Sequence, residues 1–157
     1  MSTPADGADR RRSLLGRVLA VAGAVVVVDQ VTKSLALSAL RDGPIHLLWT
    51  LRLNLTFNSG LAFSQGRGMT GLITIAAVAL VAGLLWWARQ VTTPGLAAAM
   101  GLILGGACGN LADRLVRGHG GAVVDFVDLQ WWPIFNVADA ALSCGAVLVV
   151  VLSWSKR

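Results

Sequence analysis

Residues that bind metals or act as nucleophiles are scarce in this sequence. Its 157 residues include two histidines and two cysteines, and only 13% of them are charged. A lone cysteine pair lacks the ligand spacing of a zinc site, and Cys108 and Cys144 both lie in apolar segments, where a free thiol behaves as a small buried hydrophobe. We therefore expect no metal, no other cofactor and no disulfide framework.

Nucleophilic catalysis by serine or cysteine is also disfavoured. The only histidines, His46 and His119, lie in predicted loops outside the apolar segments, so a serine within those segments has no histidine to act as its base. Cys108 and His119 form a conceivable dyad. However, Cys108 stands in the small-residue stretch GGACGN, which close helix packing explains better.

The composition is that of a membrane protein. Hydrophobic residues make up 55% of the chain, and the mean hydropathy is +0.69. The formal net charge is +5, but the basic residues stand at the ends of apolar runs rather than in one patch. That distribution is typical of topology signals and does not favour nucleic-acid binding.

Four segments are long enough to cross a bilayer, whose hydrocarbon core needs about 20 mostly apolar residues. They cover residues 14–40, 69–88, 95–112 and 133–154, and the last begins at Pro133, a favourable first helical position. The sequence thus predicts an all-α membrane protein with four transmembrane helices. Its membrane-embedded domain would span residues 13–157, behind a disordered cytoplasmic tail at residues 1–12.

The arginine cluster at residues 10–17 predicts the orientation of the chain. Positive charge before the first span favours a cytoplasmic N-terminus, and an even number of spans returns the C-terminus to the same side. As an alternative, residues 10–28 could form a cleaved secretory signal. Its apolar stretch is long for such a signal and runs into Asp29 and Lys33, so we expect a multi-pass protein of the cytoplasmic membrane.

A different periodicity appears between the first two spans. Residues 49–58 read WTLRLNLTFN and alternate between apolar and polar side chains. This pattern predicts a half-buried strand, hence a small extracytoplasmic β-strand segment. Such a strand can offer its polar face and backbone to an extended peptide, although an ordinary packed hairpin ending at residues 58–60 explains the segment at least as well.

Polar residues of three predicted spans reach the same depth. At about 1.5 Å per helical residue, Asp29 lies ~18 Å along the first span. Asn110 and Asp139 each lie ~22 Å from the cytoplasmic ends of the third and fourth spans. Buried aspartates are costly in a membrane, so these groups indicate either a site in the outer leaflet or a structural hydrogen-bond cluster that joins the helices.

Two carboxylates are the best candidates for chemistry. Asp125 and Asp139 are 14 residues apart, and the intervening loop can bring them together at the mouth of the bundle. Because no lysine or arginine occurs between residues 118 and 155, they must find partners elsewhere or share a proton, as in aspartic peptidases. Asp128 competes with Asp125 for this role, and the pattern alone does not decide between them.

Other polar residues at a similar depth could support the two carboxylates or bind substrate. Asp113 directly precedes Arg114, which favours a paired structural charge, and Arg114 could also hold a substrate carbonyl or a lipid headgroup. The amides of Asn58, Asn110 and Asn136 are suited to binding peptide backbone or to orienting carboxylates.

Five ordered motifs in this sequence resemble signal peptidase II, the bacterial lipoprotein signal peptidase family. They are DQVTK at residues 29–33, NSGLAF at 58–63, GGACGNLADR at 105–114, VVDF at 123–126 and FNVAD at 135–139. The resemblance implies a membrane-embedded aspartic endopeptidase that removes the signal peptide from diacylglyceryl-modified prolipoproteins, cutting before the lipidated cysteine. It assigns the catalytic pair to Asp125 and Asp139.

The same resemblance implies a set of residues that support the site or contact substrate and the cyclic peptide globomycin. They are Asp29, Lys33, Asn58, Gly60, Asn110, Asp113, Arg114 and Asn136. The substrate's lipid anchor would fit the outer-leaflet site that the depth of the polar residues indicates, with membrane lipid as a partner, and four spans with their own site need no second copy. The main alternative is a proton-coupled carrier that uses Asp29 and Asp139 as a relay.

Overall fold

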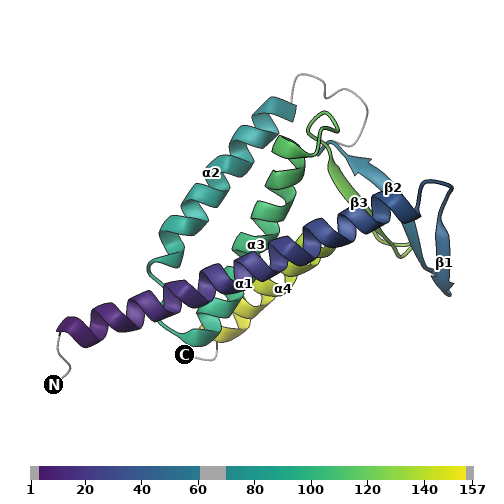
Figure 1. The fold of residues 1–157 in the computed structure, drawn as a ribbon. Helices are drawn as coiled ribbons and strands as arrows, with labels where there is room; N and C mark the ends of the chain where they lie inside the picture. Colours follow the sequence, from purple (N-terminus) through teal and green to yellow (C-terminus); the bar gives the residue numbers. More distant parts are fainter. Residues whose placement is uncertain (1–3, 61–69, 155–157) are drawn as a thin grey trace.

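The computed structural model describes residues 4–60 and 70–154 of the chain. Within them the chain forms four helices, α1 (Pro4–Ala39), α2 (Thr70–Ala88), α3 (Pro94–Val116) and α4 (Val137–Trp154), and three strands, β1 (Ile45–Leu48), β2 (Leu51–Asn58) and β3 (Val123–Asp128) (Figure 1). Residues 61–63 of the NSGLAF motif, the predicted first residue of the second span and the C-terminal Lys-Arg pair lie outside the described residues. The fold is that of the predicted all-α membrane protein with a small β segment.

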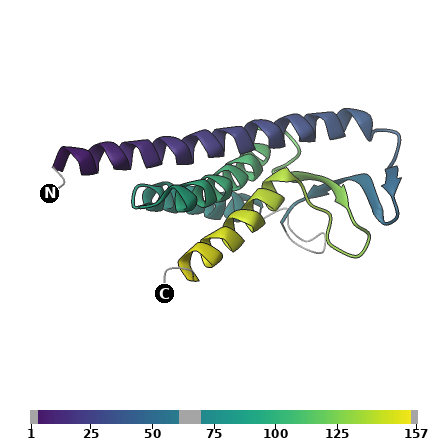
Figure 2. The same ribbon diagram turned by 90° about the horizontal axis from the view of Figure 1, so that it is seen from below.

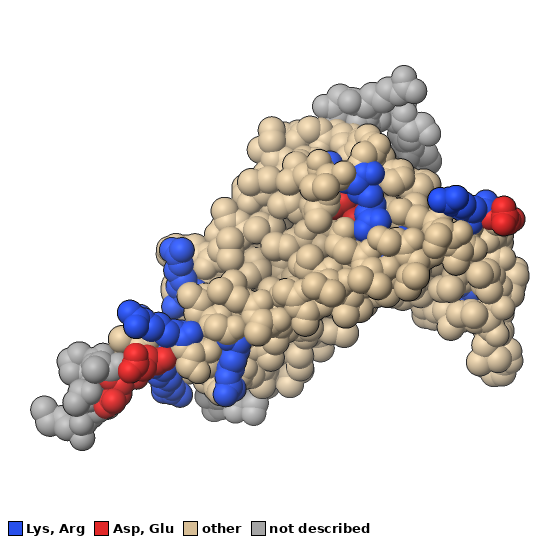
Figure 3. Space-filling model, in the orientation of Figure 1, with Lys and Arg blue, Asp and Glu red and all other residues tan. Residues whose placement is uncertain are grey.

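All four helices are long and apolar enough to cross a membrane. Large apolar side chains point outward along them, including Val27, Ile75 and Val150, each more than 60% exposed. Such exposure is expected where lipid rather than water surrounds the helices. Space-filling Figure 3 shows the same feature as a broad band without charged side chains between two charged ends. The chain is therefore a multi-pass membrane protein.

The first helix differs from the prediction at its N-terminal end. Residues 4–12, expected to be a disordered tail, continue α1, which has 36 residues and is ~54 Å long. The apolar span supplies a helix that already exists, and the arginines before it are good helix formers, so extending the helix avoids the cost of nucleation. The start of α1 and the end of α4 lie at the same end of the molecule, away from the sheet (Figure 2).

Helix α3 lies between α1 and α4, and its glycines allow the close approach (Figure 1). A Cβ added at Gly101 would lie 2.6 Å from the Cβ of Val21 in α1, and one at Gly105 would lie 2.7 Å from the Cβ of Val25. Gly106 makes the corresponding contact with α4, where a Cβ would lie 2.8 Å from Cγ of Leu142. Small residues at helix interfaces bring polar backbone and side-chain groups within reach across the bundle.

The β segment is larger than predicted. The three strands form one antiparallel sheet in the order β1-β2-β3, and β3 comes from the connection between α3 and α4. The alternating segment begins its strand at Leu51 rather than at Trp49, which has a positive φ of 49° in the turn from β1. Asp125 correspondingly lies inside strand β3.

A bulge divides the polar face expected for β2. Leu53 pairs with Val127 and Thr56 with Asp125, so β2 has one residue more than β3 between these pairs. An extra residue interrupts the alternation of side chains along a strand. Arg52 consequently contacts Asp128 whereas Asn58 contacts Asp125, although the sequence pattern predicts one shared face.

The fourth helix begins at Val137 and not at Pro133. Phe135 exchanges backbone hydrogen bonds with Val127, which keeps the chain extended up to this point. Asn136 then caps the helix. Its Oδ1 accepts from the backbone N–H of Asp139 at 2.9 Å, and its own N–H donates to Oδ2 of Asp139 at 3.2 Å. This reciprocal cap places Asp139 in the first turn of α4.

Candidate active site

A cluster of buried polar residues lies where the helices meet the sheet. Five of its members, each at most 2% exposed, come from α1, α3, β3 and the start of α4. They are Asp29, Lys33, Asp113, Asp125 and Asn136. Because an unpaired buried charge costs several kcal/mol, each charged member needs a partner within the cluster.

Asp125 is the most enclosed carboxylate on the sheet side. Asn136 donates its Nδ2 to Oδ1 of Asp125 at 2.6 Å, and Asn58 donates its Nδ2 to Oδ2 at 3.1 Å. Burial raises the pKa of Asp125 to about 6, and the negative charge of Asp139 acts in the same direction. The two amide donors and the charge of Lys33 oppose that rise without cancelling it. Asp125 therefore keeps a proton to a much higher pH than an exposed aspartate.

Asp139 is held from the helix side by Asn110 and Asn136. Asn110 of α3 donates its Nδ2 to Oδ1 of Asp139 at 2.8 Å, and the backbone N–H of Asn136 reaches the other oxygen. Asn136 thus contacts both aspartates, with its side chain on Asp125 and its backbone on Asp139. The predicted meeting of Asp29, Asn110 and Asp139 at one level is confirmed, since all three belong to this network.

Lys33 supplies the buried positive charge of the cluster. Its Nζ lies 2.8 Å from Asp29, 2.9 Å from Asp113 and 3.1 Å from Oδ1 of Asn110. The ammonium therefore neutralises two carboxylates and also polarises the amide that donates to Asp139. The prediction of Asp113 as a paired charge is correct, but its partners are Lys33 and Arg117 rather than the adjacent Arg114. Neighbouring helical residues point in different directions, whereas residues four apart share a face.

Asp29 connects α1 to the start of α4. Its Oδ1 accepts the backbone N–H of Ala138 at 3.0 Å, one of the donors that a helix leaves unpaired in its first turn. Gly109 makes room for this contact, because a Cβ there would lie 2.6 Å from Oδ2 of Asp29. Asp29 thereby holds in position the helical turn that carries Asp139.

Two residues of this network are absent from the predicted set. Gln30 donates its Nε2 to Asp29, to Asp113 and to the carbonyl of Gly109, and Arg117 bonds Asp113 and Gln30. Gln30 stands within the DQVTK motif, so its position offered a signal. Arg117 follows Asp113 by one helical turn, a spacing that predicts an ion pair once α3 is known to extend to Val116.

Asp128 does not share the site of Asp125. Its carboxylate is paired with Arg52 of β2 at 2.7 Å and also accepts from Asn54 and from the backbone N–H of Gln130. The hydrogen bond from Arg52 is the main reason that the pKa of Asp128 lies below its usual value. An aspartate held ionised by its own arginine is a poor proton donor, so the geometry favours Asp125.

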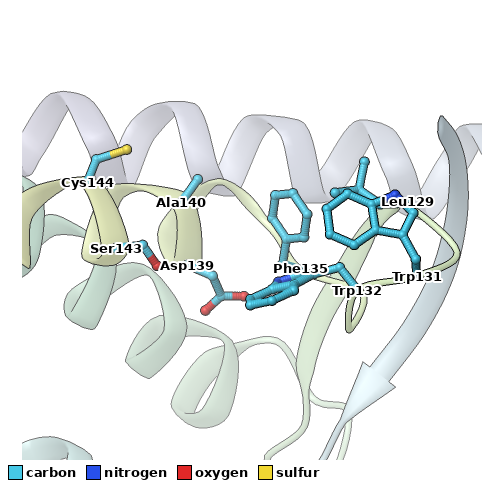
Figure 4. Close-up of a pocket in the computed structure, with 8 residues that line it drawn as sticks. All are labelled: Leu129, Trp131, Trp132, Phe135, Asp139, Ala140, Ser143 and Cys144. Atoms are coloured by element: carbon cyan, nitrogen blue, oxygen red, sulfur yellow. The ribbon is translucent and has the colours of Figure 1, made fainter. Parts of the chain in front are cut away.

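A hollow of about 420 Å³ opens beside Asp139. Figure 4 shows Asp139 directed from α4 toward the aromatic side chains of the β3–α4 connection. Leu129, Trp131, Trp132 and Phe135 supply most of the apolar lining. Asp125 is buried and is not among the residues that line this hollow, whereas Asp139 lines it and is partly exposed. The two aspartates are therefore distinguished by access as well as by their hydrogen bonds.

Gly60 and Arg114 lie next to the cluster on its other side. Oδ1 of Asn58 accepts the backbone N–H of Gly60 at 2.8 Å, in a turn where Gly60 has a φ of 85° that favours glycine. Arg114 donates its Nη1 to the carbonyl of Asn110, whereas its buried Nε has no hydrogen-bond partner among the described residues. All the predicted supporting residues thus belong to or border one site.

Comparison of the sequence with known proteins identifies a family and several relatives. The model of the family described as signal peptidase (SPase) II matches residues 21–155. A lipoprotein signal peptidase of Mycobacterium avium (strain 104) is 45% identical over 157 residues, covering 97% of this chain and 85% of the relative. A lipoprotein signal peptidase of Rhodococcus jostii (strain RHA1) is 44% identical over 157 residues, covering 97% of this chain and 78% of the relative.

The fold has a counterpart among solved structures. A structure described as a bacterial membrane enzyme, solved by the in meso method at 2.3 Å resolution, superposes with a TM-score of 0.77 at 26% sequence identity, over 89% of this chain and 88% of that one. The region that the family model matches, residues 21–155, includes every member of the polar cluster. The chain belongs to the signal peptidase II family.

Proposed function

We propose that this peptidase removes the signal peptide from diacylglyceryl-modified prolipoproteins, cutting before the lipidated cysteine, and that Asp125 and Asp139 are its catalytic pair. The observation that carries the assignment is the joint anchoring of these two carboxylates by Asn136 and their adjacent amides. One of them is buried with a pKa raised to about 6, and the other faces an open hollow. A proton donor beside an accessible carboxylate is what amide hydrolysis by water requires.

The reaction then follows in two proton-balanced steps. Asp139 takes a proton from a water molecule as the water oxygen bonds to the scissile carbonyl carbon, and Asp125 gives its proton to the carbonyl oxygen. The resulting tetrahedral diol collapses when Asp139 returns a proton to the amide nitrogen and the C–N bond breaks. Asp125 takes back the hydroxyl proton as the carboxylic acid forms, so both aspartates end in their starting states.

The surroundings of the pair suit a lipid-anchored peptide. The apolar hollow beside Asp139 can receive an apolar group of the substrate, such as an acyl chain. Asn58 and Arg114 offer hydrogen-bond donors for peptide carbonyls. Pairing with β1 ends at Leu53, so beyond this residue the edge of β2 that faces away from β3 can align an extended segment. We expect a globomycin-like cyclic peptide to compete for the same groups. One chain contains every group named here, which supports action as a monomer.

The proposed orientation has both termini in the cytoplasm and the aspartate pair at the outer leaflet. The arginine cluster lies at the start of α1, at the end of the molecule away from the sheet (Figure 3). The polar cluster lies at the opposite end, where the helices meet the sheet. A proton-coupled carrier is not favoured, because the family is one of peptidases.

The test is cleavage of a diacylglyceryl-modified prolipoprotein by the purified protein in detergent, read as a gel shift. We expect Asp125→Asn and Asp139→Asn to abolish cleavage while Asp128→Asn retains it. Asp128→Asn is the matched control because it makes the same change three residues away on the same strand. If Asp128→Asn abolished cleavage while Asp125→Asn retained it, the catalytic pair would be Asp128 and Asp139. An intact precursor with the wild-type protein would refute the proposed function.

A further inference from the structure

A basic hollow lies at the end of the bundle that carries the N-terminus, remote from the aspartate pair. Its volume is about 480 Å³. One wall is formed by α1 and the other by the turn between α2 and α3. The residues used below are Arg10, Arg11, Leu14, Gln90, Val91 and Thr92.

The floor of this hollow is the end of the hydrophobic core. Leu14 and Val91 are buried members of the core cluster that joins α1, α2 and α3. Arg10 stands one helical turn before Leu14, ~6 Å further along α1, and is exposed. The hollow therefore changes from apolar to charged over about one helical turn. In a membrane protein this change marks the level at which acyl chains give way to headgroups.

The rim is positively charged. Residues 6–17 together with Arg89 contain five arginines and two aspartates, a net charge of +3 (Figure 3). Arg10 and Arg11 both line the hollow, and both are exposed. Their guanidinium groups are therefore available for an external anion.

We propose that this hollow binds the phosphate of an anionic phospholipid headgroup. Arg10 and Arg11 would donate charge-assisted hydrogen bonds to the phosphate oxygens, for which the planar guanidinium is well matched. Gln90 and Thr92 supply uncharged polar groups for the hydroxyls of the headgroup, and Leu14 and Val91 meet the first carbons of the acyl chains. Basic pockets between spans are suited to such headgroups. A zwitterionic lipid is disfavoured because its own cation would face the arginines.

The experiment titrates the full-length protein, purified in an uncharged detergent, with short-chain phosphatidylglycerol and measures binding by native mass spectrometry. We expect the double variant Arg10→Gln/Arg11→Gln to bind ~30-fold more weakly, from the typical contribution of an arginine at an anionic surface. The matched control is Arg12→Gln/Arg17→Gln, which removes the same charge from the same end of α1 but outside the hollow. It should stay within about 3-fold of wild type, because charges beyond the hollow act through screened solvent.

Three outcomes would overturn the inference. Equal losses in the two double variants would mean that diffuse charge attracts the lipid and that the hollow has no role. Phosphatidylcholine with the same chains binding as tightly as phosphatidylglycerol would show that only the acyl chains are recognised. Displacement of the lipid by equimolar inorganic phosphate would identify a free-phosphate site. Because all four arginines are exposed, tryptophan fluorescence should report the same unfolding transition for both variants and wild type.

Discussion

Replacing Lys33 by methionine should destabilise the protein by about 3–5 kcal/mol, the usual cost of removing one partner from a buried ion pair. Lys33 is 0% exposed and lies within 2.9 Å of two carboxylates. Methionine has a similar volume, so the change removes the charge without leaving a large cavity. Asp113 keeps its second partner, Arg117, at 2.9 Å. Asp29 keeps only neutral donors, so most of the cost comes from its unpaired negative charge.

The assay is reversible unfolding in detergent followed by tryptophan fluorescence. Arg52→Met is the control, since it also removes the cation of an ion pair with an aspartate. The expected loss is smaller than for Lys33→Met, because the Arg52 side chain is 29% exposed and Asp128 keeps hydrogen bonds from Asn54 and from the backbone N–H of Gln130. Adding Asp29→Asn to Lys33→Met should recover part of the stability, with a coupling of about 1–3 kcal/mol between the two positions. If Lys33→Met cost no more than Arg52→Met, the interpretation of Lys33 as the essential buried counter-charge would be wrong.

Three further predictions follow from the same geometry. Because the pKa of Asp125 is raised on folding, its contribution to stability is complete below pH 3.8 and is lost as the pH rises through about 6. The loss is at most about 3 kcal/mol, and this pH dependence should be absent when the free energy of unfolding of Asp125→Asn is measured against pH. Asn136→Ala removes the cap of α4 and should cost about 1 kcal/mol of stability, yet lower cleavage about 100-fold because both aspartates lose a shared anchor; a rate loss no larger than the stability loss explains would contradict this role. Gly106→Ala should destabilise the α3–α4 contact by about 1–3 kcal/mol, whereas Gly23→Ala, with open space around its Cβ position, should be neutral or stabilising; equal unfolding midpoints for the two variants would argue against close packing there.

Local pattern was sufficient for the membrane spans and for most of the site. Runs of about 20 apolar residues have few alternatives to a transmembrane helix, so α2 and α3 begin within one residue of their predicted starts. The depth of each residue along the first, third and fourth spans also predicted the meeting of Asp29, Asn110 and Asp139. Boundaries were less predictable where another segment competed for the backbone. Pro133 is a good helix start in isolation, but pairing of Phe135 with Val127 keeps the chain extended until Asn136.

The sequence by itself determined that the chain is a membrane protein, which carboxylates lie at one level, and which family motifs it contains. These properties depend on composition and on spacing along single helices. Only the tertiary structure decided the different surroundings of Asp125 and Asp128, because a bulge in β2 turns Arg52 toward one aspartate and Asn58 toward the other. It likewise decided that Lys33 neutralises Asp113, since the two residues are 80 positions apart and meet only because α1 approaches α3 closely along the glycines of α3.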